Sequence, residues 1–198
     1  EIRAKSPADM EIEVLVHGAM CVSFSGRCLL SSYLVNRDAN RGQCAQPCRL
    51  PYGKNGYALS LKDMCLAEHL TELSEMGVAS LKIEGRMKAP EYVYGVTKIY
   101  RTLLDESRNA GEKEIAELSA LFSRSGFTCG YYTGDIGRDM LGIRTADDKK
   151  ESAKLLGSTI PEAKAEISLS ADIRTGERAS VTASGIFGGK SVTYTAIG

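Results

Sequence analysis

The apolar and polar positions of residues 1–125 follow two periods, one typical of strands and one typical of helices. Residues 11–17, EIEVLVH, alternate acidic and apolar positions and then become apolar, which predicts a strand that enters a core. In residues 60–77 the leucines recur at helical spacing, which predicts a helix capped by Ser60 and Gly77. Further elements are expected as a strand at 78–84, a helix from Pro90 onward and a helix at 111–122. This order is that of a parallel α/β unit.

From about residue 163 the pattern changes to a period of two. Three alternating runs are separated by turns at Gly176 and at Gly188-Gly189, which predicts a three-stranded antiparallel meander. Three strands make a thin domain, so we expect it to pack on the α/β part or to belong to a larger β domain. The expected organisation is an α/β segment at 1–125, a loop and linker at 126–162 and the β-meander at 163–198.

Composition limits the class of protein. The chain has 198 residues, 43% of them hydrophobic, and balances 25 basic against 25 acidic side chains, as an ordinary globular protein does. Neutrality argues against an obligatory polyanion binder, although a local basic patch can exist within a balanced total. No apolar run approaches the about 20 residues of a membrane span, and the first residues lack the apolar stretch of a signal peptide. We therefore expect a cytoplasmic protein without a membrane partner. Because the chain begins at Glu1 without Met, we also expect an excised piece of a longer protein.

The cysteines are the clearest chemical signal. Five of the six lie between Cys21 and Cys65, and in a chain of this size without an export signal they are expected as reduced thiols or metal ligands. Four of them follow the spacing Cys-x6-Cys-x15-Cys-x3-Cys, namely Cys21, Cys28, Cys44 and Cys48. Glycine and proline near these residues let loops bend around one zinc ion or one iron–sulfur cluster. The alternative is a set of free buried thiols. We expect Cys65 to pack against the core, with replacement of another ligand as its alternative, and Cys129 to be structural.

Several motifs occur together in one order. The stretch EVLVHGAMCVSFSGRCLLS is followed by RGQCAQPCRLPY, SLKDMC and SLKIEGRMKAPEYV. From about Glu11 to Tyr100 the chain resembles the collagenase-like peptidases of family U32. The tail from GYYTGDIGRDMLG onward resembles the longer members of that family, which append a β-rich domain.

The resemblance implies a fold, a cofactor and two kinds of activity. It implies an α/β barrel, of which this chain carries only the later strands and the rest of the longer protein supplies the others. Some members are named for collagen degradation, whereas others are implicated in oxygen-independent or prephenate-linked hydroxylation of transfer RNA, ribosomal RNA or ubiquinone precursors. At least some of the latter hold a four-iron four-sulfur cluster through cysteines. By motif position, the four spaced cysteines are the counterparts of such ligands.

Other candidate site residues follow from their positions. His17 and Glu84 fall at or just past the ends of predicted strands, where α/β barrels keep catalytic groups, and Arg86 follows closely. These three are the expected catalytic residues, and the alternative for Glu84 is a structural pair with Arg86 or Lys82. The expected substrate-binding residues are Arg49, for a phosphate or carboxylate, and Tyr92, for stacking on a base. Such tyrosines more often half-bury at a helix surface.

Three functions therefore remain open. The first is an enzyme whose iron–sulfur cluster or zinc supports hydroxylation of RNA or a small aromatic substrate. The second is a metal- or thiol-dependent endopeptidase acting on collagen-like proteins, in which Cys21 and His17 could form a dyad. The third is a non-catalytic, zinc-stapled binding module. The residues favour a metallocentre, because the sequence has only two histidines and neither a His-Glu-x-x-His nor a Gly-x-Ser-x-Gly motif.

Overall fold

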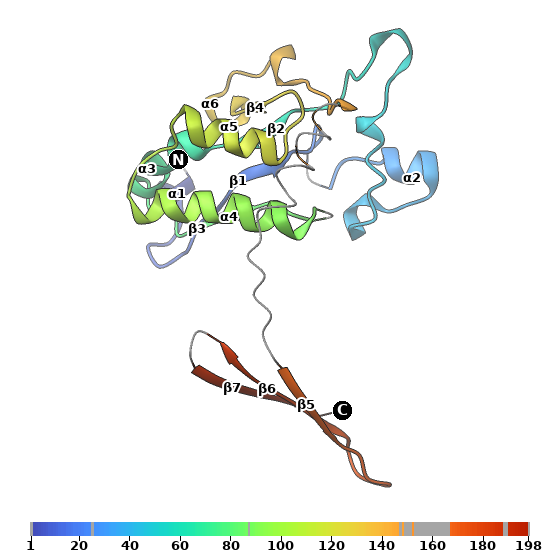
Figure 1. The fold of residues 1–198 in the computed structure, drawn as a ribbon. Helices are drawn as coiled ribbons and strands as arrows, with labels where there is room; N and C mark the ends of the chain where they lie inside the picture. Colours follow the sequence, from blue (N-terminus) through green and yellow to red (C-terminus); the bar gives the residue numbers. More distant parts are fainter. Residues whose placement is uncertain are drawn as a thin grey trace. The chain divides into compact units, whose positions relative to one another are not determined.

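The computed structural model describes residues 2–24, 26–86, 88–146, 148, 152, 167–187 and 190–197. The chain divides into two compact units, residues 1–160 and 161–198 (Figure 1). The first unit combines a sheet with helices, and the second unit carries a separate sheet of three strands. An α/β part followed by a small antiparallel β part is therefore confirmed.

The sheet of the first unit is mixed. Its strands, in the spatial order β3-β1-β2-β4, are β1 (Glu13–Ala19), β2 (Asp63–Cys65), β3 (Ser80–Ile83) and β4 (Phe127–Thr128). Strand β1 runs parallel to β3 and antiparallel to β2, and β2 runs parallel to β4. The parallel pair matches the expected α/β unit, whereas β2 reverses direction inside it. Closure of a barrel remains an expectation from the family resemblance.

Two longer helices cover the sheet (Figure 1). They are α4 (Pro90–Asp105) and α5 (Glu112–Leu121), near the ranges expected from their amphipathic patterns. Val96, Leu103 and Leu118 are fully buried between them and the strands, and each such side chain stabilises the fold by about 1.5–3 kcal/mol. The helices approach closely at Gly95, where a Cβ atom would lie 2.8 Å from a methyl of Leu121.

The expected helix at 60–77 is wrong in its first half. The three residues of β2 pair with β1 and are all buried, so Cys65 lies on a strand and the helix α3 begins only at Leu70. The Ser60 hydroxyl does not cap a helix, because it donates a hydrogen bond to the carbonyl oxygen of Gly142 at 2.7 Å. The remaining short α-helices are α1 (Ile2–Lys5), α2 (Leu30–Val35), α3 (Leu70–Glu75) and α6 (Gly130–Thr133). Single 3-10 turns are Ala39–Arg41, Pro47–Arg49, Gly53–Asn55, Ala67–His69 and Arg138–Met140.

The second unit is an antiparallel meander. Its strands are β5 (Ile167–Asp172), β6 (Ser180–Phe187) and β7 (Lys190–Ile197), in the order β5-β6-β7. Residues 163–166 and the expected glycine turn at 188–189 lie outside the described residues. The side chains of β5 and β7 are exposed, including Leu169 and Tyr194 at 72% each.

Residues 126–146, expected as a loop, contain regular secondary structure. They contain β4 and α6, and Met140 is buried in the core of the first unit. Across the part of the chain that the structure describes, no helix has both the length and the apolar character to cross a membrane.

Candidate functional site

One edge of the sheet collects most of the candidate site residues. Because β1 and β3 run opposite to β2 and β4, the ends of the first pair meet the beginnings of the second pair at this edge. Ala19 pairs with Asp63, and Asp63 pairs with Phe127. The segment from Cys21 onward starts at this edge, and the turn that begins at Glu84 leaves it.

The end of β1 lies close against the turn after β3 at Gly18. The φ of this glycine is 114°, a backbone conformation that favours glycine. A Cβ atom there would lie 2.7 Å from the carbonyl oxygen of Glu84. The backbone N–H of Glu84 also donates to the carbonyl oxygen of His17 at 2.8 Å, which fixes the end of β3 beside β1.

Two of the four spaced cysteines have sulfur atoms that accept backbone hydrogen bonds. The N–H of Ser23 points to Sγ of Cys21 at 3.4 Å, and the N–H of Gln46 points to Sγ of Cys44 at 3.3 Å. Both cysteines are exposed. Hydrogen bonds of this kind stabilise negative charge on sulfur and tune thiolate-ligated clusters.

The turn between Cys44 and Cys48 has a defined local structure. Gln46 adopts a left-handed conformation with φ 55°, and Pro47 begins the 3-10 turn that carries Cys48. The N–H of Ala45 donates to the hydroxyl of Ser31, a fully buried residue of α2 just after Cys28, at 3.0 Å. The second and third cysteines are therefore linked through α2.

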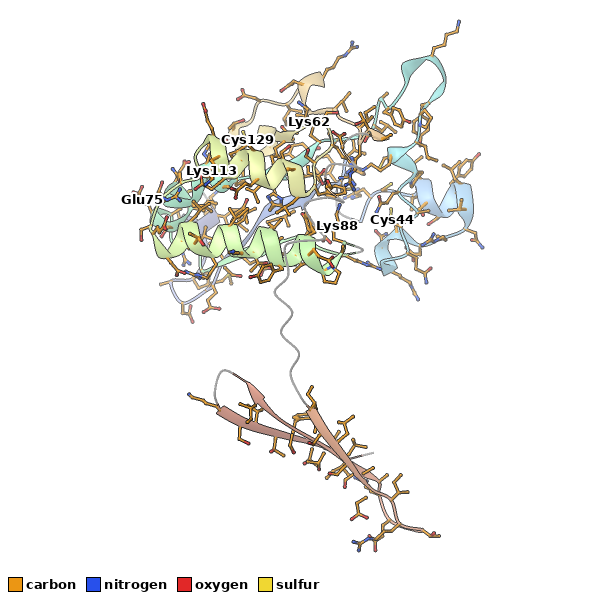
Figure 2. All side chains as sticks on the ribbon, viewed as in Figure 1. Cys44, Lys62, Glu75, Lys88, Lys113 and Cys129 are labelled. Carbon is orange, nitrogen blue, oxygen red and sulfur yellow. The ribbon has the colours of Figure 1, made fainter. Side chains whose placement is uncertain are left out.

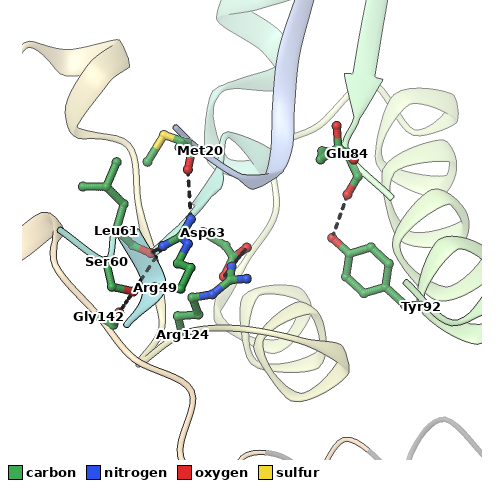
Figure 3. Close-up of polar contacts among 9 residues, drawn as sticks. All are labelled: Met20, Arg49, Ser60, Leu61, Asp63, Glu84, Tyr92, Arg124 and Gly142. Atoms are coloured by element: carbon green, nitrogen blue, oxygen red, sulfur yellow. Dashed lines mark hydrogen bonds and ion pairs between the residues drawn. The ribbon is translucent and has the colours of Figure 1, made fainter. Parts of the chain in front are cut away.

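Arg49 links the last cysteine to the first (Figure 3). Its Nη2 donates to the carbonyl oxygen of Met20 at 2.9 Å, and its Nη1 donates to the carbonyl oxygen of Leu61 and the hydroxyl of Ser60. Arg49 follows Cys48 in the chain and Met20 precedes Cys21. The guanidinium thus holds both ends of the cysteine segment at the sheet edge.

The cysteines also affect one another electrostatically. Burial raises the pKa of the Cys48 thiol, the charge of Arg49 lowers it, and the charges of Cys21, Cys44 and Cys28 raise it further. All three other thiols are therefore near enough to influence Cys48. We call residues 20–49 with these four thiols the four-cysteine segment.

The family model of peptidase family U32 matches residues 1–141 of this chain. The chain belongs to peptidase family U32. An uncharacterized protease of Methanocaldococcus jannaschii is 41% identical, covering 68% of this chain and 37% of that protein. The tRNA hydroxylation protein P1 of Bacillus subtilis is 45% identical, covering 53% of this chain and 29% of its own length. A collagenase of Porphyromonas gingivalis is 37% identical, covering 63% of this chain and 34% of its own length. No solved structure matches.

The names of these U32 relatives divide between proteolysis and RNA hydroxylation. The 23S rRNA 5-hydroxycytidine C2501 synthase of Escherichia coli is a second relative named for RNA hydroxylation; it is 43% identical, covering 53% of this chain and 18% of its own length. The chain spans only about a third of the length of the first three relatives.

The cysteine thiols of this U32 chain are of the chemical type that binds zinc or an iron–sulfur cluster. All six cysteines are free, and thiolates are the ligands of both structural zinc and iron–sulfur clusters. Among the residues that the structure describes, no three His, Cys, Asp or Glu side chains stand close enough to hold a metal ion. Ligation therefore requires the four sulfur atoms to move closer together than they lie as free thiols.

Glu84 and Arg86 occupy the turn after β3. The Glu84 carboxylate accepts the backbone N–H of Arg86 at 2.7 Å, and Nη2 of Arg86 donates to the carbonyl oxygen of Gly42 at 2.6 Å. Gly42 lies two residues before Cys44, so Arg86 ties this turn to the four-cysteine segment. Lys82, the other expected partner of Glu84, instead pairs with Glu13 at 3.3 Å.

His17 lies inside the core rather than at the open edge. Its ring is fully buried, and its Nδ1 is 3.3 Å from the hydroxyl of Tyr100, which donates to the carbonyl oxygen of Val16 at 3.1 Å. Burial, assisted by the charge of Lys88, lowers the pKa of His17 to about 3. The ring is therefore neutral at ordinary pH, with an Nε2 that lacks a hydrogen-bond partner within the described structure.

The expected substrate-binding residues are both engaged within the protein. Tyr92 is 2% exposed, its hydroxyl reaches the carbonyl oxygen of Glu84 at 3.5 Å, and burial raises its pKa. Arg49 is occupied by the contacts described above. The roles expected for these two residues, and the catalytic roles of His17, Glu84 and Arg86, stay predictions.

The two other cysteines pack in the first unit. Cys65 is buried on β2 with Sγ 3.7 Å from the hydroxyl of Tyr100, and burial raises its pKa. Cys129 is partly buried against the core.

Sequence reasoning missed a charged pair at the same edge. Nη1 of Arg124 lies 2.6 and 2.7 Å from the two carboxylate oxygens of Asp63, whose side chain is 1% exposed (Figure 3). These residues are far apart in the chain, and although Asp63 belongs to the motif SLKDMC, no motif links it to Arg124. A charged residue inside the buried run LKDMCL was the one signal that could have found the pair.

Proposed function

We propose that this chain is the cluster-binding part of an enzyme that hydroxylates a base of RNA. The observation that carries the proposal is the hydrogen bond from Arg49 to Met20, because it brings the two ends of the four-cysteine segment together at the sheet edge. The RNA hydroxylation names of relatives that are 45% and 43% identical support the choice of reaction and substrate.

In this proposal Cys21, Cys28, Cys44 and Cys48 hold a four-iron four-sulfur cluster. Such a cluster supplies electron transfer or Lewis acidity at this edge. The backbone N–H groups of Ser23 and Gln46 stabilise thiolate charge, as they already point to sulfur atoms. Three further hydrogen bonds support the segment, namely Ala45 to Ser31, Arg49 to Met20 and Arg86 to Gly42.

Glu84 is the acidic group that we assign to proton transfer. It is partly exposed at the end of β3, and Arg86 in the same turn reaches the four-cysteine segment. His17, in contrast, is fully buried and contacts Tyr100. A neutral buried histidine is suited to holding Tyr100 and the end of β1 in place.

Anaerobic purification tests the cluster. We expect a brown protein with about four irons and four sulfides per chain, both absent in Cys44→Ser and Cys48→Ser. Cys129→Ser is the matched control, because this cysteine lies outside the four-cysteine segment, and it should keep the iron. Stoichiometric zinc without iron, absent in the same two variants, would instead favour the zinc-stapled binding module.

Nucleoside mass spectrometry tests the reaction. RNA from cells that make the protein should contain a hydroxylated nucleoside that is absent with Cys48→Ser and reduced with Glu84→Gln. If the cluster is present and no modified nucleoside depends on these residues, the proposed reaction is wrong even though the cofactor is right.

The peptidase alternative rests on the names protease and collagenase among the relatives. A thiol dyad of Cys21 with His17 requires the ring to leave its buried contact with Tyr100. The second histidine, His69, lies 3.6 Å from Glu72 and packs on Tyr132. Gelatin cleavage by the pure protein that disappears in Cys21→Ser would reverse our preference.

A further inference from the structure

Three cationic side chains surround the ring of Phe122, just after α5. Nζ of Lys88 lies 2.7 Å from the ring centroid, Cζ of Arg144 lies 4.0 Å from it and Cζ of Arg124 lies 5.1 Å from it. The cations come from three separate segments of the chain. Cations are attracted to the face of an aromatic ring, but one ring does not cancel the repulsion among three positive charges.

Nearby carboxylates neutralise only part of this charge. Asp63 is paired with Arg124, and Asp63 and Asp148 both act on Arg144. Asp148 also accepts the backbone N–H of Thr145 at 2.7 Å. Arg49 adds a fourth positive charge that acts on Lys88. Among the residues that the structure describes, four cations therefore face two carboxylates, although the whole chain has no net charge.

The electrostatics of the individual groups agree with an excess of positive charge. Burial lowers the pKa of Lys88 to about 7; the charge of Asp63 opposes this, while Arg124, Arg144 and Arg49 add to it. Burial, and then the charge of Arg124, lowers the pKa of Arg144. Its Nε is buried and has no hydrogen-bond partner among the described atoms. An anion placed here would remove repulsion and satisfy a buried donor.

The group of cations is accessible and lies near the four-cysteine segment. Lys88 and Arg144 are only partly buried, so an anion in solvent can reach both side chains. Lys88 also borders an open hollow along α4, which neither Arg124 nor Arg144 lines. Arg49, the residue after Cys48, acts electrostatically on both Lys88 and Cys48. An anion held by these cations would therefore lie within electrostatic reach of Arg49, the residue that follows Cys48.

We propose that Lys88, Arg124 and Arg144 form an oxyanion pocket that binds a phosphate group of the RNA substrate. This inference rests on the proposed RNA hydroxylation and adds the anchor that positions the nucleotide. Guanidinium groups match the geometry of phosphate oxygens, and lysine supplies a compact charge. The pocket fixes the backbone of the RNA, whereas the identity of the base is read elsewhere.

The first test measures binding of a labelled single-stranded RNA to the full chain over a range of salt concentrations. Lys88→Gln and Arg144→Gln should each weaken binding about tenfold and reduce the slope of log affinity against log salt by about 0.7 for each phosphate that is no longer neutralised. Lys113→Gln is the control, because Lys113 is exposed in the first turn of α5, whereas Phe122 and its cations lie at the other end of this helix (Figure 2). We avoid Arg124 variants, because they leave the Asp63 carboxylate buried without its partner.

The second test uses pH. Binding needs protonated Lys88, so affinity should fall as pH rises through about 7, and Lys88→Gln should remove this dependence. Phosphodiesters do not titrate in this range. Among the described residues, the charged groups acting on Lys88 are Asp63, Arg124, Arg144 and Arg49. The Tyr92 ring lies 5.4 Å from its Nζ, and burial raises the pKa of Tyr92, so this hydroxyl stays neutral in the range, as does His17.

Three outcomes overturn the proposal. One is equal weakening by Lys88→Gln and Lys113→Gln, which shows a general charge effect. Another is unchanged RNA binding in both pocket variants, with circular dichroism showing that they are folded. The third is displacement by malonate but not by inorganic phosphate, which assigns the pocket to a small carboxylate. RNA binding is measured on the anaerobically purified protein, and its readout is affinity, so its failure is distinguishable from failure of the proposed reaction, which is read from modified nucleosides.

Discussion

Arg49 donates a hydrogen bond to the carbonyl oxygen of Met20 at 2.9 Å and thereby joins two positions 29 residues apart. The same guanidinium also donates hydrogen bonds to the hydroxyl of Ser60 and the carbonyl oxygen of Leu61, so one side chain connects the four-cysteine segment to the start of β2. A lysine could not make these contacts together, because its donors share one nitrogen.

Replacing this residue should damage both stability and cofactor binding. Arg49→Gln leaves carbonyl groups without their donor, and we expect a loss of roughly 2–4 kcal/mol in the free energy of unfolding. Urea unfolding measures the loss, and the iron content after anaerobic reconstitution should fall with it. Arg41→Gln is the control, because its side chain is 83% exposed. Equal losses of stability and iron in the two variants would show that the Arg49 contacts do not hold the four-cysteine segment in place.

The thiols of the metal-free protein should react at different rates. Cys21 and Cys44 are exposed, whereas burial raises the pKa of Cys48 and of Cys65 and so lowers their thiolate fractions. Timed alkylation followed by mass spectrometry should label the exposed pair first and Cys65 last. Reconstitution with iron and sulfide should protect the four spaced cysteines and leave Cys129 reactive. Protection of Cys129 alone would contradict the ligand assignment.

His17 should make the protein less stable in acid. Its pKa is about 3 when folded and 6.5 when exposed, so the unfolded chain binds more protons between these values. The contribution of neutral His17 to the free energy of unfolding is therefore fully present above pH 6.5. It decreases as the pH falls toward 3, by up to about 1.4 kcal/mol per pH unit. Urea unfolding at several pH values should show this slope in the native protein. His17→Leu should lack it, and an identical slope in both would show that other groups cause it.

The pair of Asp63 and Arg124 should be strongly coupled. Asp63→Asn or Arg124→Gln alone should cost about 3–5 kcal/mol, because each leaves the partner charge poorly compensated in a buried place. The double replacement Asp63→Leu with Arg124→Leu should cost less than the two single losses combined. A double-mutant cycle by chemical unfolding measures the coupling. Strict additivity would show that the two charges do not interact.

Elements with a long regular pattern could be predicted from the sequence. The helix from Pro90 shows one apolar stripe over several turns, and the meander alternates over three strands, so local pattern and tertiary packing agree. Strand β2 could not be predicted, because three residues carry too little pattern and the surrounding leucines also suit a helix. Its conformation is decided by pairing with β1, which lies far away in the sequence.

For the candidate site, the sequence offered candidate donor atoms but none of the contacts that position them. The spacing of the cysteines and their neighbouring glycine and proline residues pointed to four thiols, whose role as ligands stays a proposal. The contacts that position them, such as Arg86 with Gly42, join distant segments and leave no periodic signal. The group of cations around Phe122 could not be predicted either, because Lys88, Arg124 and Arg144 come from three separate segments of the chain.

The direct pairing of Ala19 with Asp63 has a consequence for how this part of the molecule can be changed. Strands β1 and β2 are antiparallel neighbours joined by residues 20–62. The two residues that flank this connection, Ala19 and Asp63, pair directly with each other. The proposed metal-binding chemistry is therefore a module inserted into a turn. Grafting a different connection between these two residues would alter the reactive surface while the strand pair beneath kept its register, so the scaffold and the chemistry can evolve separately.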